Sequence, residues 1–233
     1  MLISGLQKMT LLDYPGVVAC TVFTGGCNFR CPFCHNASLV LPEALQASDG
    51  GVEAVLSFLK KRQGLLDGVA ITGGEPLLHA DMDLFLREVK ALGYRVKLDT
   101  NGTFPDRLIS LVEEKLVDRV AMDIKNDPAL YAKTAGLASM DMAAVTKSKD
   151  FLLSGAVEYE FRTTVVRGLH TRESLLAAAR WIEGAEAYFL QQFKDSGELI
   201  DGAGLGAFSD EEMRELCEAV RPIIPTVQLR GVD

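Results

Sequence analysis

Short runs of β-branched and apolar residues alternate along the chain with longer segments in which apolar residues recur at helical spacing. The short runs predict strands at about 17–23, 68–72, 94–98, 119–124, 157–166, 187–190 and 226–229. The longer segments predict amphipathic helices at about 49–62, 81–92, 105–116, 142–153, 171–183 and 209–220. This alternation predicts an α/β fold whose strands form a parallel sheet with right-handed crossovers.

Local signals support the predicted helix boundaries. Pro105, Thr171 and Ser209 stand where three helices are expected to begin, and Gly64 and Gly93 follow two of the expected helix ends. Six strand–helix repeats are fewer than the eight of a complete barrel. A partial barrel is therefore expected, with an open doubly wound sheet as the alternative. No linker or internal repeat interrupts the pattern, so residues 1–233 are expected to form one domain.

Composition narrows the class of protein. Of the 233 residues, 48% are hydrophobic and 24% are charged, which is typical of a globular chain with a large core. The formal net charge of −8 makes a nucleic acid or an anionic membrane an unfavourable partner. No apolar run approaches the roughly 20 residues of a membrane span, and the first residues lack the pattern of a signal peptide. We expect a cytoplasmic protein.

Unusual polar chemistry follows four consecutive predicted strands. The strand ends run into residues 24–27, 73–76, 99–102 and 123–125, which are rich in Gly, Asp, Asn, Glu, Lys and Cys. Each segment alone is also compatible with an ordinary turn. Because ligand sites of parallel α/β folds lie at the carboxyl ends of the strands, one shared site is the better interpretation.

Three of the five cysteines, Cys27, Cys31 and Cys34, form a C-x3-C-x2-C cluster after the first predicted strand. A structural zinc site normally needs a fourth protein ligand, and His35 is awkwardly placed for that role. The alternative to a metal site is that the three cysteines are buried free thiols. A cubane iron–sulfur cluster with one iron free of cysteine suits three close thiolates better. Cys20 and Cys217 lie within a predicted strand and helix and are expected to be structural.

This cysteine spacing, with Phe33 before the last cysteine, resembles the signature of the radical S-adenosylmethionine superfamily. The resemblance implies a partial (β/α)6 barrel, one 4Fe-4S cluster held by the three cysteines, and S-adenosylmethionine as the second cofactor. The segments at 10–16, 20–27 and 34–36 are further similar to the glycyl-radical-enzyme activases, above all those of anaerobic ribonucleoside-triphosphate reductase. The likeness covers the whole chain, strongly up to about residue 125.

The resemblance assigns roles to the strand-end residues. Gly73, Gly74 and Glu75 match the superfamily motif that binds the amino group of S-adenosylmethionine, because glycines expose carbonyl oxygens and Glu75 adds negative charge. Asp99 and Asn101 are included in the cofactor site, although Asp-Thr-Asn-Gly is also typical of a plain turn.

Two further groups of cofactor contacts are expected. Asp123 and Lys125 are two residues apart on a strand and therefore share a face, where the carboxylate suits ribose hydroxyls and the ammonium suits the methionyl carboxylate. A surface ion pair is the alternative. Phe33, Cys34 and His35 resemble the activase segment that lies along the adenine, so His35 is assigned to binding rather than to acid–base work.

Arg162 is a charged residue within a predicted strand. It is expected either to reach the cofactor or to form an ion pair with Glu160 or Glu158.

The activases of pyruvate formate-lyase place a histidine after the sixth strand, and here Gln192 or Phe193 is expected to replace it. His79 and His170 are expected to be ordinary surface or loop residues.

The resulting functional hypothesis is an activating enzyme. It would cleave S-adenosylmethionine reductively and generate a glycyl radical on a partner, with anaerobic ribonucleoside-triphosphate reductase as first choice and a flavodoxin or ferredoxin as electron donor. No additional cysteine-rich segment predicts a second cluster. A radical enzyme acting on a small molecule or nucleobase is the main alternative, and a non-catalytic iron–sulfur or zinc module is the alternative from another class.

Overall fold

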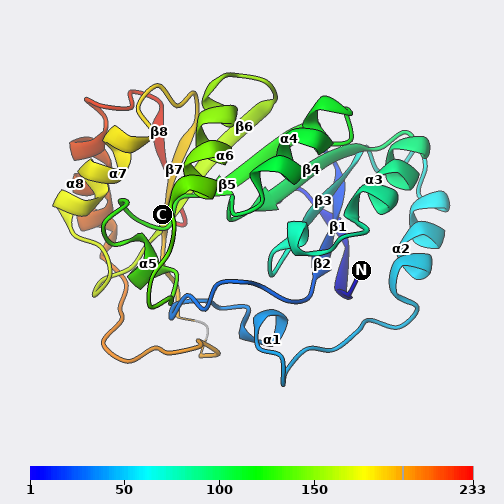
Figure 1. Cartoon of the computed structure of the whole chain (residues 1–233), viewed down its shortest axis with the longest axis horizontal. Helices are drawn as coiled ribbons and strands as arrows, with labels where there is room; N and C mark the ends of the chain where they lie inside the picture. Colours follow the sequence, from blue (N-terminus) through cyan, green and yellow to red (C-terminus); the bar gives the residue numbers. More distant parts are fainter. Residues whose placement is uncertain (196, 233) are drawn as a thin grey trace.

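The computed structural model describes residues 1–195 and 197–232, and in this part of the chain eight strands form one sheet (Figure 1). Their order across the sheet is their order in the sequence. The first pair is antiparallel and every later pair is parallel. The strands are β1 (Ile3–Thr10), β2 (Ala19–Thr24), β3 (Gly68–Gly73), β4 (Arg95–Thr100), β5 (Arg119–Asp123), β6 (Glu158–Val165), β7 (Tyr188–Gln192) and β8 (Val227–Arg230).

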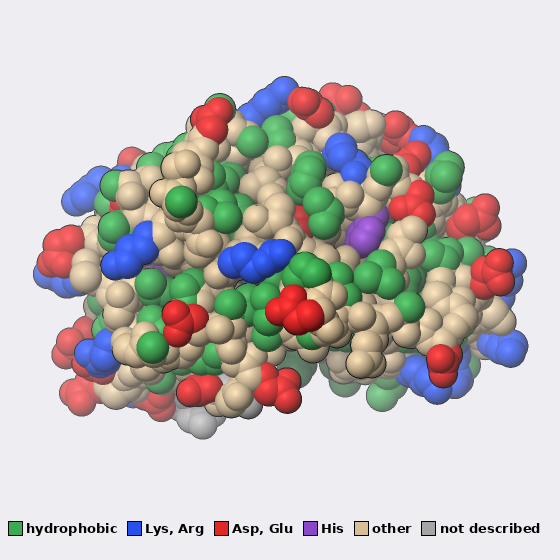
Figure 2. Space-filling model, turned by 60° about the horizontal axis from the view of Figure 1, so that its bottom comes forward, with side chains coloured by type: hydrophobic (Ala, Val, Ile, Leu, Met, Phe, Trp, Pro, Cys, Tyr) green, Lys and Arg blue, Asp and Glu red, His purple; other side chains and the backbone are tan. Residues whose placement is uncertain are grey.

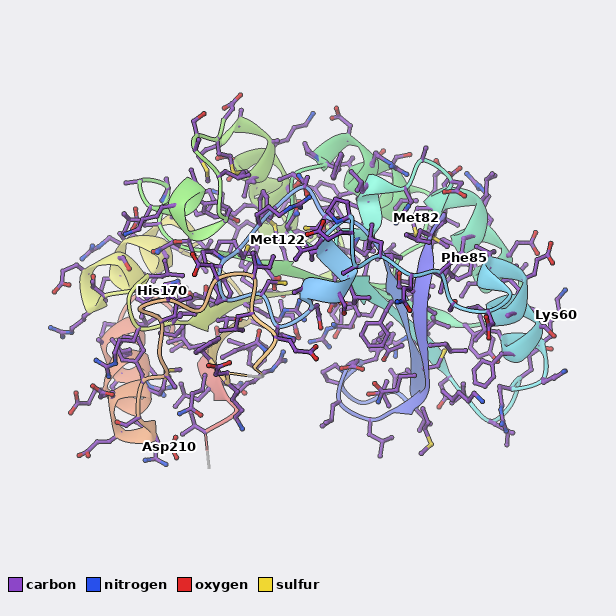
Figure 3. All side chains as sticks on the ribbon, turned by 90° about the horizontal axis from the view of Figure 1, so that it is seen from below. Lys60, Met82, Phe85, Met122, His170 and Asp210 are labelled. Carbon is purple, nitrogen blue, oxygen red and sulfur yellow. The ribbon has the colours of Figure 1, made fainter. Side chains whose placement is uncertain are left out.

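Helices follow six of these strands in turn, which gives six strand–helix units from β2 to β7. The six helices are α2 (Gly51–Lys60), α3 (Met82–Ala91), α4 (Pro105–Glu113), α6 (Ala143–Leu153), α7 (Arg172–Trp181) and α8 (Asp210–Val220). The sheet does not close, because β1 and β8 are its two edges. Figure 3 shows the helices in an arc around the outside of the sheet, with the side between the two edges left without a helix. The predicted partial (β/α)6 barrel is confirmed.

Side chains along each strand alternate between two environments. On β4, Val96 and Leu98 are fully buried in the hydrophobic core beneath the helices, whereas Asp99 lines a cavity on the other face. On β5, Val120 and Met122 belong to the same core. Because side chains point to opposite faces at a period of two, one set builds the packed outer layer. The other set is free to carry polar chemistry inside the barrel.

The predicted helix starts are confirmed by the observed caps. Pro105 occupies the first turn of α4, where the missing N–H costs nothing. Thr171 and Ser209 each accept a hydrogen bond from the third backbone amide of the following helix, completing capping boxes on α7 and α8. Gly64 and Gly93 have positive φ angles of 77° and 88°, which favour glycine after a helix.

Some elements were not predicted from the sequence. β1 adds an antiparallel edge to the expected all-parallel sheet, and three one-turn helices lie in loops: α1 (Ala37–Val40), η1 (Pro76–Leu78) and α5 (Tyr131–Thr134). α1 and α5 flank the carboxyl ends of the strands in Figure 1. Among the described residues, no helix has both the length and the apolar character needed to span a membrane.

Candidate functional site

A cavity of about 310 Å³ lies at the carboxyl ends of the parallel strands and continues into the barrel. Figure 2 shows the molecule turned toward this side, where hydrophobic side chains are interspersed with acidic and basic ones, in the middle of the face as well as along its margins. The sequence-predicted residues that line the cavity are Cys27, Cys31, Phe33, Cys34, His35, Gly73, Gly74, Asp99, Asn101, Asp123 and Lys125. The structure therefore brings together four strand ends, and Glu75 alone of the predicted set is absent from the lining.

The cysteine loop is held in shape by hydrogen bonds within the loop and by one to the end of α5. The Arg30 guanidinium donates to the carbonyl oxygens of Cys27 and Phe29, both at 2.7 Å. The Cys34 amide donates to the Cys31 carbonyl at 3.0 Å, which turns the chain back toward the cavity. The Arg30 amide also donates to the Ala135 carbonyl at 2.9 Å, so the loop is tied to the end of α5. These contacts hold the three thiols on one wall.

The three thiols line the cavity, and their chemistry suits an iron–sulfur centre. Burial raises the pKa of Cys31 to about 12 and also raises the pKa of Cys27, although the nearby Lys125 ammonium lowers both. A cationic centre is therefore needed to stabilise the thiolates. Within the described residues, no group of three or more His, Cys, Asp or Glu side chains is arranged to hold one metal ion. A 4Fe-4S cluster instead binds each thiolate to a different iron, and soft sulfur donors on one cavity wall fit that cofactor.

Two glycines let the neighbouring loops approach closely. A Cβ built on Gly74 would lie 1.9 Å from the Gly26 carbonyl oxygen, and one built on Gly73 would lie 2.3 Å from the Thr24 carbonyl oxygen. Gly73 also has a φ of 123°, a conformation that L side chains rarely adopt. The loop after β3 therefore packs against the start of the cysteine loop through backbone alone, which leaves its peptide groups at the cavity wall.

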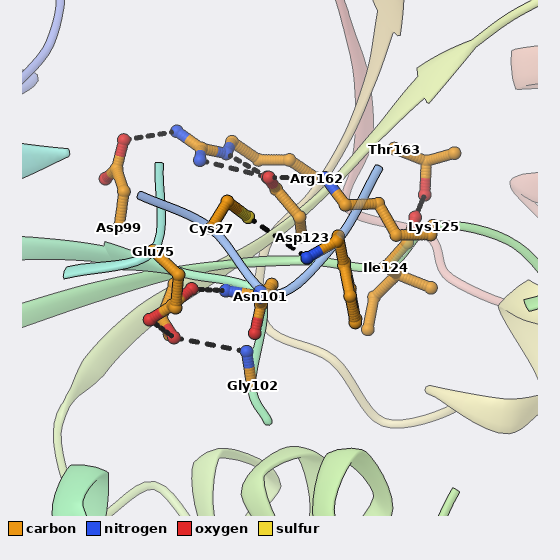
Figure 4. Close-up of polar contacts among 12 residues, drawn as sticks. Cys27, Glu75, Asp99, Asn101, Gly102, Asp123, Ile124, Lys125, Arg162 and Thr163 are labelled. Atoms are coloured by element: carbon orange, nitrogen blue, oxygen red, sulfur yellow. Dashed lines mark hydrogen bonds and ion pairs between the residues drawn. The ribbon is translucent and has the colours of Figure 1, made fainter. Parts of the chain in front are cut away.

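Glu75 lies behind this wall and is fully buried. Its carboxyl group accepts hydrogen bonds from the Leu77 amide at 3.0 Å and the Thr100 hydroxyl at 2.8 Å. It also accepts one from the Asn101 amide at 2.7 Å (Figure 4). Burial raises the pKa of Glu75 to about 7, although these three donors act in the opposite direction. In this structure Glu75 joins the ends of β3 and β4, and its predicted contact with an ammonium stays a prediction.

Opposite charges from three strands form one network on the inner wall (Figure 4). The Lys125 ammonium donates to Asp123 at 2.9 Å. Arg162 on β6 donates to the second Asp123 oxygen at 3.0 Å and to Asp99 at 3.0 Å. Burial opposes ionisation of Asp123, but Lys125 and Arg162 hold its pKa far below the usual range. The predicted pair of Arg162 with Glu160 or Glu158 is wrong, because those glutamates lie farther along the barrel and bind Arg119.

Buried groups support Lys125 from behind. The His170 ring is 3% exposed, which corrects its predicted surface position. Its Nε2 lies 2.8 Å from the Lys125 carbonyl oxygen, while its Nδ1 lies 3.1 Å from the Val166 amide. The ring therefore accepts from Val166 and donates to Lys125, a pattern that requires the neutral Nε2–H tautomer. Burial lowers the pKa of His170, in keeping with this neutral form.

The end of β7 contributes a different residue from those expected. Gln191 lines the cavity, whereas the Gln192 amide donates to the Phe208 carbonyl at 3.0 Å and to Asp210 at 2.7 Å, and Phe193 is buried in the core. The prediction that Gln192 or Phe193 replaces a cofactor-contacting histidine is therefore wrong. Strand alternation decides which glutamine faces inward, and the sequence alone did not fix that register.

Sequence reasoning also missed a role for Asp13. This residue follows β1, lines the cavity and accepts a hydrogen bond from the Thr21 hydroxyl on β2. A lone acidic residue in a turn gives little signal, because Asp is common in turns. Its position depends on the unpredicted β1.

Comparison with known proteins places these observations in a family. Residues 21–136 match the Radical SAM superfamily. The chain is 29% identical to a Methanocaldococcus jannaschii protein named "Putative glycyl-radical enzyme activating enzyme". The alignment covers the full length of this chain and 97% of that protein. It is also 39% identical to the 7-carboxy-7-deazaguanine synthase of Halobacterium salinarum, in an alignment that covers 38% of this chain and 33% of that enzyme.

A comparison with solved structures concerns the fold. Streptococcus suis SuiB bound to S-adenosylmethionine superposes with a TM-score of 0.69 over 89% of this chain, at 15% identity. The chain spans about half the length of SuiB, so this likeness concerns the fold alone. Together with the cysteine loop and the partial barrel, the matched segment shows that the chain belongs to the Radical SAM superfamily.

Proposed function

We propose that the protein is an activating enzyme that generates a glycyl radical on a partner enzyme. One observation carries this proposal: three thiols and the Lys125–Asp123 pair face the same cavity at the open end of a barrel. This arrangement offers a site for a cluster beside a site for a zwitterionic cofactor. The full-length similarity to a protein named as a glycyl-radical enzyme activating enzyme supports the choice within the superfamily.

The cavity residues suit the separate parts of S-adenosylmethionine. Cys27, Cys31 and Cys34 would hold one 4Fe-4S cluster. The Lys125 ammonium, whose pKa is raised by Asp123 despite burial, stays charged and would bind the methionyl carboxylate. Asp123, ionised at neutral pH, would accept hydrogen bonds from the ribose hydroxyls.

Other wall residues would complete the cofactor site. Carbonyl oxygens of Gly73 and Gly74 would accept hydrogen bonds from the amino group, with Glu75 contributing negative charge from behind the wall. Phe33, Cys34 and His35 would lie along the adenine, and Asp99 and Asn101 would border the site. The Phe33 ring already lies 6.0 Å from the Lys125 ammonium, so the two groups share one wall.

The chemistry supplied by the bound cofactors is reductive cleavage of S-adenosylmethionine to methionine and a 5′-deoxyadenosyl radical, which takes a hydrogen atom from the glycine Cα of the partner. The protein contributes binding, orientation and exclusion of water. A flavodoxin or ferredoxin would deliver the electron. Anaerobic ribonucleoside-triphosphate reductase is our first choice of partner, because the segments at 10–16 and 20–27 resemble its activating proteins.

The test is an anaerobic reaction of the reconstituted, reduced protein with S-adenosylmethionine and a candidate glycyl radical enzyme. We expect the doublet of a glycyl radical in the electron paramagnetic resonance spectrum, and no doublet when the partner glycine is changed to Ala. Cys27→Ala should abolish the signal, whereas Cys20→Ala, at a buried strand position away from the cavity, should retain it.

A second candidate function follows from the partial match to a deazaguanine synthase. In that case the protein would act on a small molecule or nucleobase without a protein partner. Turnover of such a substrate, together with no glycyl radical on any glycyl radical enzyme of the same cell, would favour this alternative.

A further inference from the structure

The end of β1 and the loop that follows it expose three apolar side chains close together in the sequence. Met9 is 63% exposed, Leu11 64% and Leu12 87%. Among the described residues the other exposed large hydrophobic side chains are Leu65 at 64%, Leu84 at 61% and Leu78 at 43%, and each lies in a different element or loop. Single exposed apolar residues need no explanation, but three within four positions form a patch. We call Met9, Leu11 and Leu12 the apolar lip.

The apolar lip lies at the side of the barrel that no helix covers. β1 is one edge of the sheet and β8 is the other, and Figure 3 shows the turn after β1 projecting on the helix-free side between them. The residue that follows the lip, Asp13, lines the cavity. Thr10 pairs with Ala19 at the start of β2, so the lip lies near the amino-terminal ends of the parallel strands. The cavity extends from the cysteine loop at the carboxyl ends of the strands to Asp13, the residue next to the lip.

The loop is built to hold this exposed position. The buried Thr10 hydroxyl accepts hydrogen bonds from the Leu12 amide at 3.2 Å and the Asp13 amide at 3.1 Å. The Val17 amide donates to the Tyr14 carbonyl at 3.0 Å, and the Tyr14 ring is buried beneath the turn. The hydrogen bonds to Thr10 and the buried Tyr14 ring fix the backbone of this loop. The lip side chains therefore face solvent in a defined conformation.

We propose that the apolar lip is a docking surface for the protein substrate, contacting an apolar surface beside the glycine that enters the barrel. This inference rests on the proposed function and names the part of this chain that would recognise the partner. A second copy of the chain is a poorer occupant, because a stable dimer interface uses roughly 20–30 residues a side. A patch of three side chains suits a transient encounter between an enzyme and its protein substrate.

The test uses the reconstituted holoenzyme and the triple variant Met9→Ser, Leu11→Ser, Leu12→Ser. With the glycyl radical enzyme as substrate, we expect its KM to rise about tenfold, since that corresponds to about 1.4 kcal/mol of lost apolar contact. Iron content and slow S-adenosylmethionine cleavage without partner should match the wild type, which shows that the variant is folded and loaded. Leu12→Ser alone should show part of the effect.

Leu84→Ser is the matched control, because Leu84 is 61% exposed on the outer helix α3 and does not line the cavity. It should leave the KM for the partner unchanged. An unchanged KM in the triple variant would overturn the docking proposal while leaving the activase function intact. A wild-type protein that forms no radical on any glycyl radical enzyme would instead defeat the proposed function and the docking proposal with it. A wild-type dimer that the triple variant converts to a monomer would also overturn docking.

Discussion

At the scale of single residues, Glu75 gives the clearest pH dependence. Burial raises the pKa of its carboxyl group to about 7, above the ordinary value of 4.5. Between these values the folded protein keeps a proton that the unfolded chain releases. The free energy of unfolding should therefore fall by about 3 kcal/mol as pH rises through this window. Glu75→Gln removes the titration, so the stability of the wild type relative to the variant should decrease from about pH 5 to about pH 8.

Urea unfolding of both proteins under anaerobic conditions measures this difference. Glu113→Gln, at an exposed position on α4, is the control and should show no such trend relative to the wild type. A pH-independent difference between wild type and Glu75→Gln would mean that Glu75 keeps its charge over the whole window, held by its three hydrogen-bond donors.

The same scale shows what the sequence revealed about the site and what it did not. Strand-end positions of Asp123, Lys125 and Gly74 followed from the β/α pattern, and all three line the cavity. Two adjacent residues can nevertheless face opposite ways, as Gly74 and Glu75 do, because the turn geometry after a strand is set by contacts with distant loops. The partners of Arg162 depended on the pairing of β5 with β6, which no local pattern encodes.

At the scale of elements, the short edge strand β8 is fastened to the barrel interior by one ion pair. Arg230 donates to both oxygens of the fully buried Glu160, at 2.8 and 3.1 Å, and its guanidinium lies 3.4 Å from the centre of the Phe189 ring. Burial alone would raise the pKa of Glu160, but the bonds from Arg230 and the nearby Lys97 charge hold it at about 2. This carboxylate therefore contributes stability above about pH 4.5 that is lost as pH falls toward 2.

Arg230→Met keeps the apolar stem and removes the charge, leaving Glu160 with Arg119 as its remaining hydrogen-bond partner. We expect a loss of about 3–5 kcal/mol in unfolding free energy at about pH 7, because a buried charge is left under-compensated. The loss should be smaller at about pH 5, where Glu160 can take up a proton. Arg221→Met, which breaks the exposed pair with Glu218 on α8, should cost less than about 1 kcal/mol. Equal losses in the two variants would contradict the proposed fastening.

Elements were predictable where a local period exists. The six long helices carry apolar residues at helical spacing, and the seven parallel strands are short runs rich in apolar, β-branched or aromatic residues, so each was located within a few residues. β1 was missed because its sequence, ISGLQKMT, has no regular alternation and residues 7–9 near its end are exposed. Its strand conformation depends on antiparallel pairing with β2 across a long turn. The one-turn helices α1 and α5 are too short to show any period.

At the scale of the whole molecule, the cysteine loop is bound to its own continuation and to two distant segments. The Gly26 amide donates to Leu39 at 2.7 Å, the Arg30 amide to Ala135 at 2.9 Å and the Asp201 amide to Pro32 at 3.0 Å. A Cβ at Gly136 would lie 1.9 Å from the Arg30 carbonyl oxygen, so the loop and the end of α5 are in close backbone contact. The barrel is thus a packed scaffold, and the loops at its open end hold one another around the proposed cluster.

The difference between the packed barrel and the loops around the proposed cluster predicts the outcome of iron removal. Chelation of iron from the reduced, anaerobic protein should leave the far-ultraviolet circular dichroism nearly unchanged, because the ladder from β2 to β8 and the core beneath the helices do not require the loop. Amide hydrogen exchange should accelerate in residues 25–41 and in their contact segments near 129–137 and 199–205, while β3 to β6 stay protected. A variant with Ser at Cys27, Cys31 and Cys34 should show the same exchange pattern without chelator. Loss of protection throughout the sheet would mean that folding and cluster binding are a single event, and an unchanged pattern would mean that the loop holds no cluster.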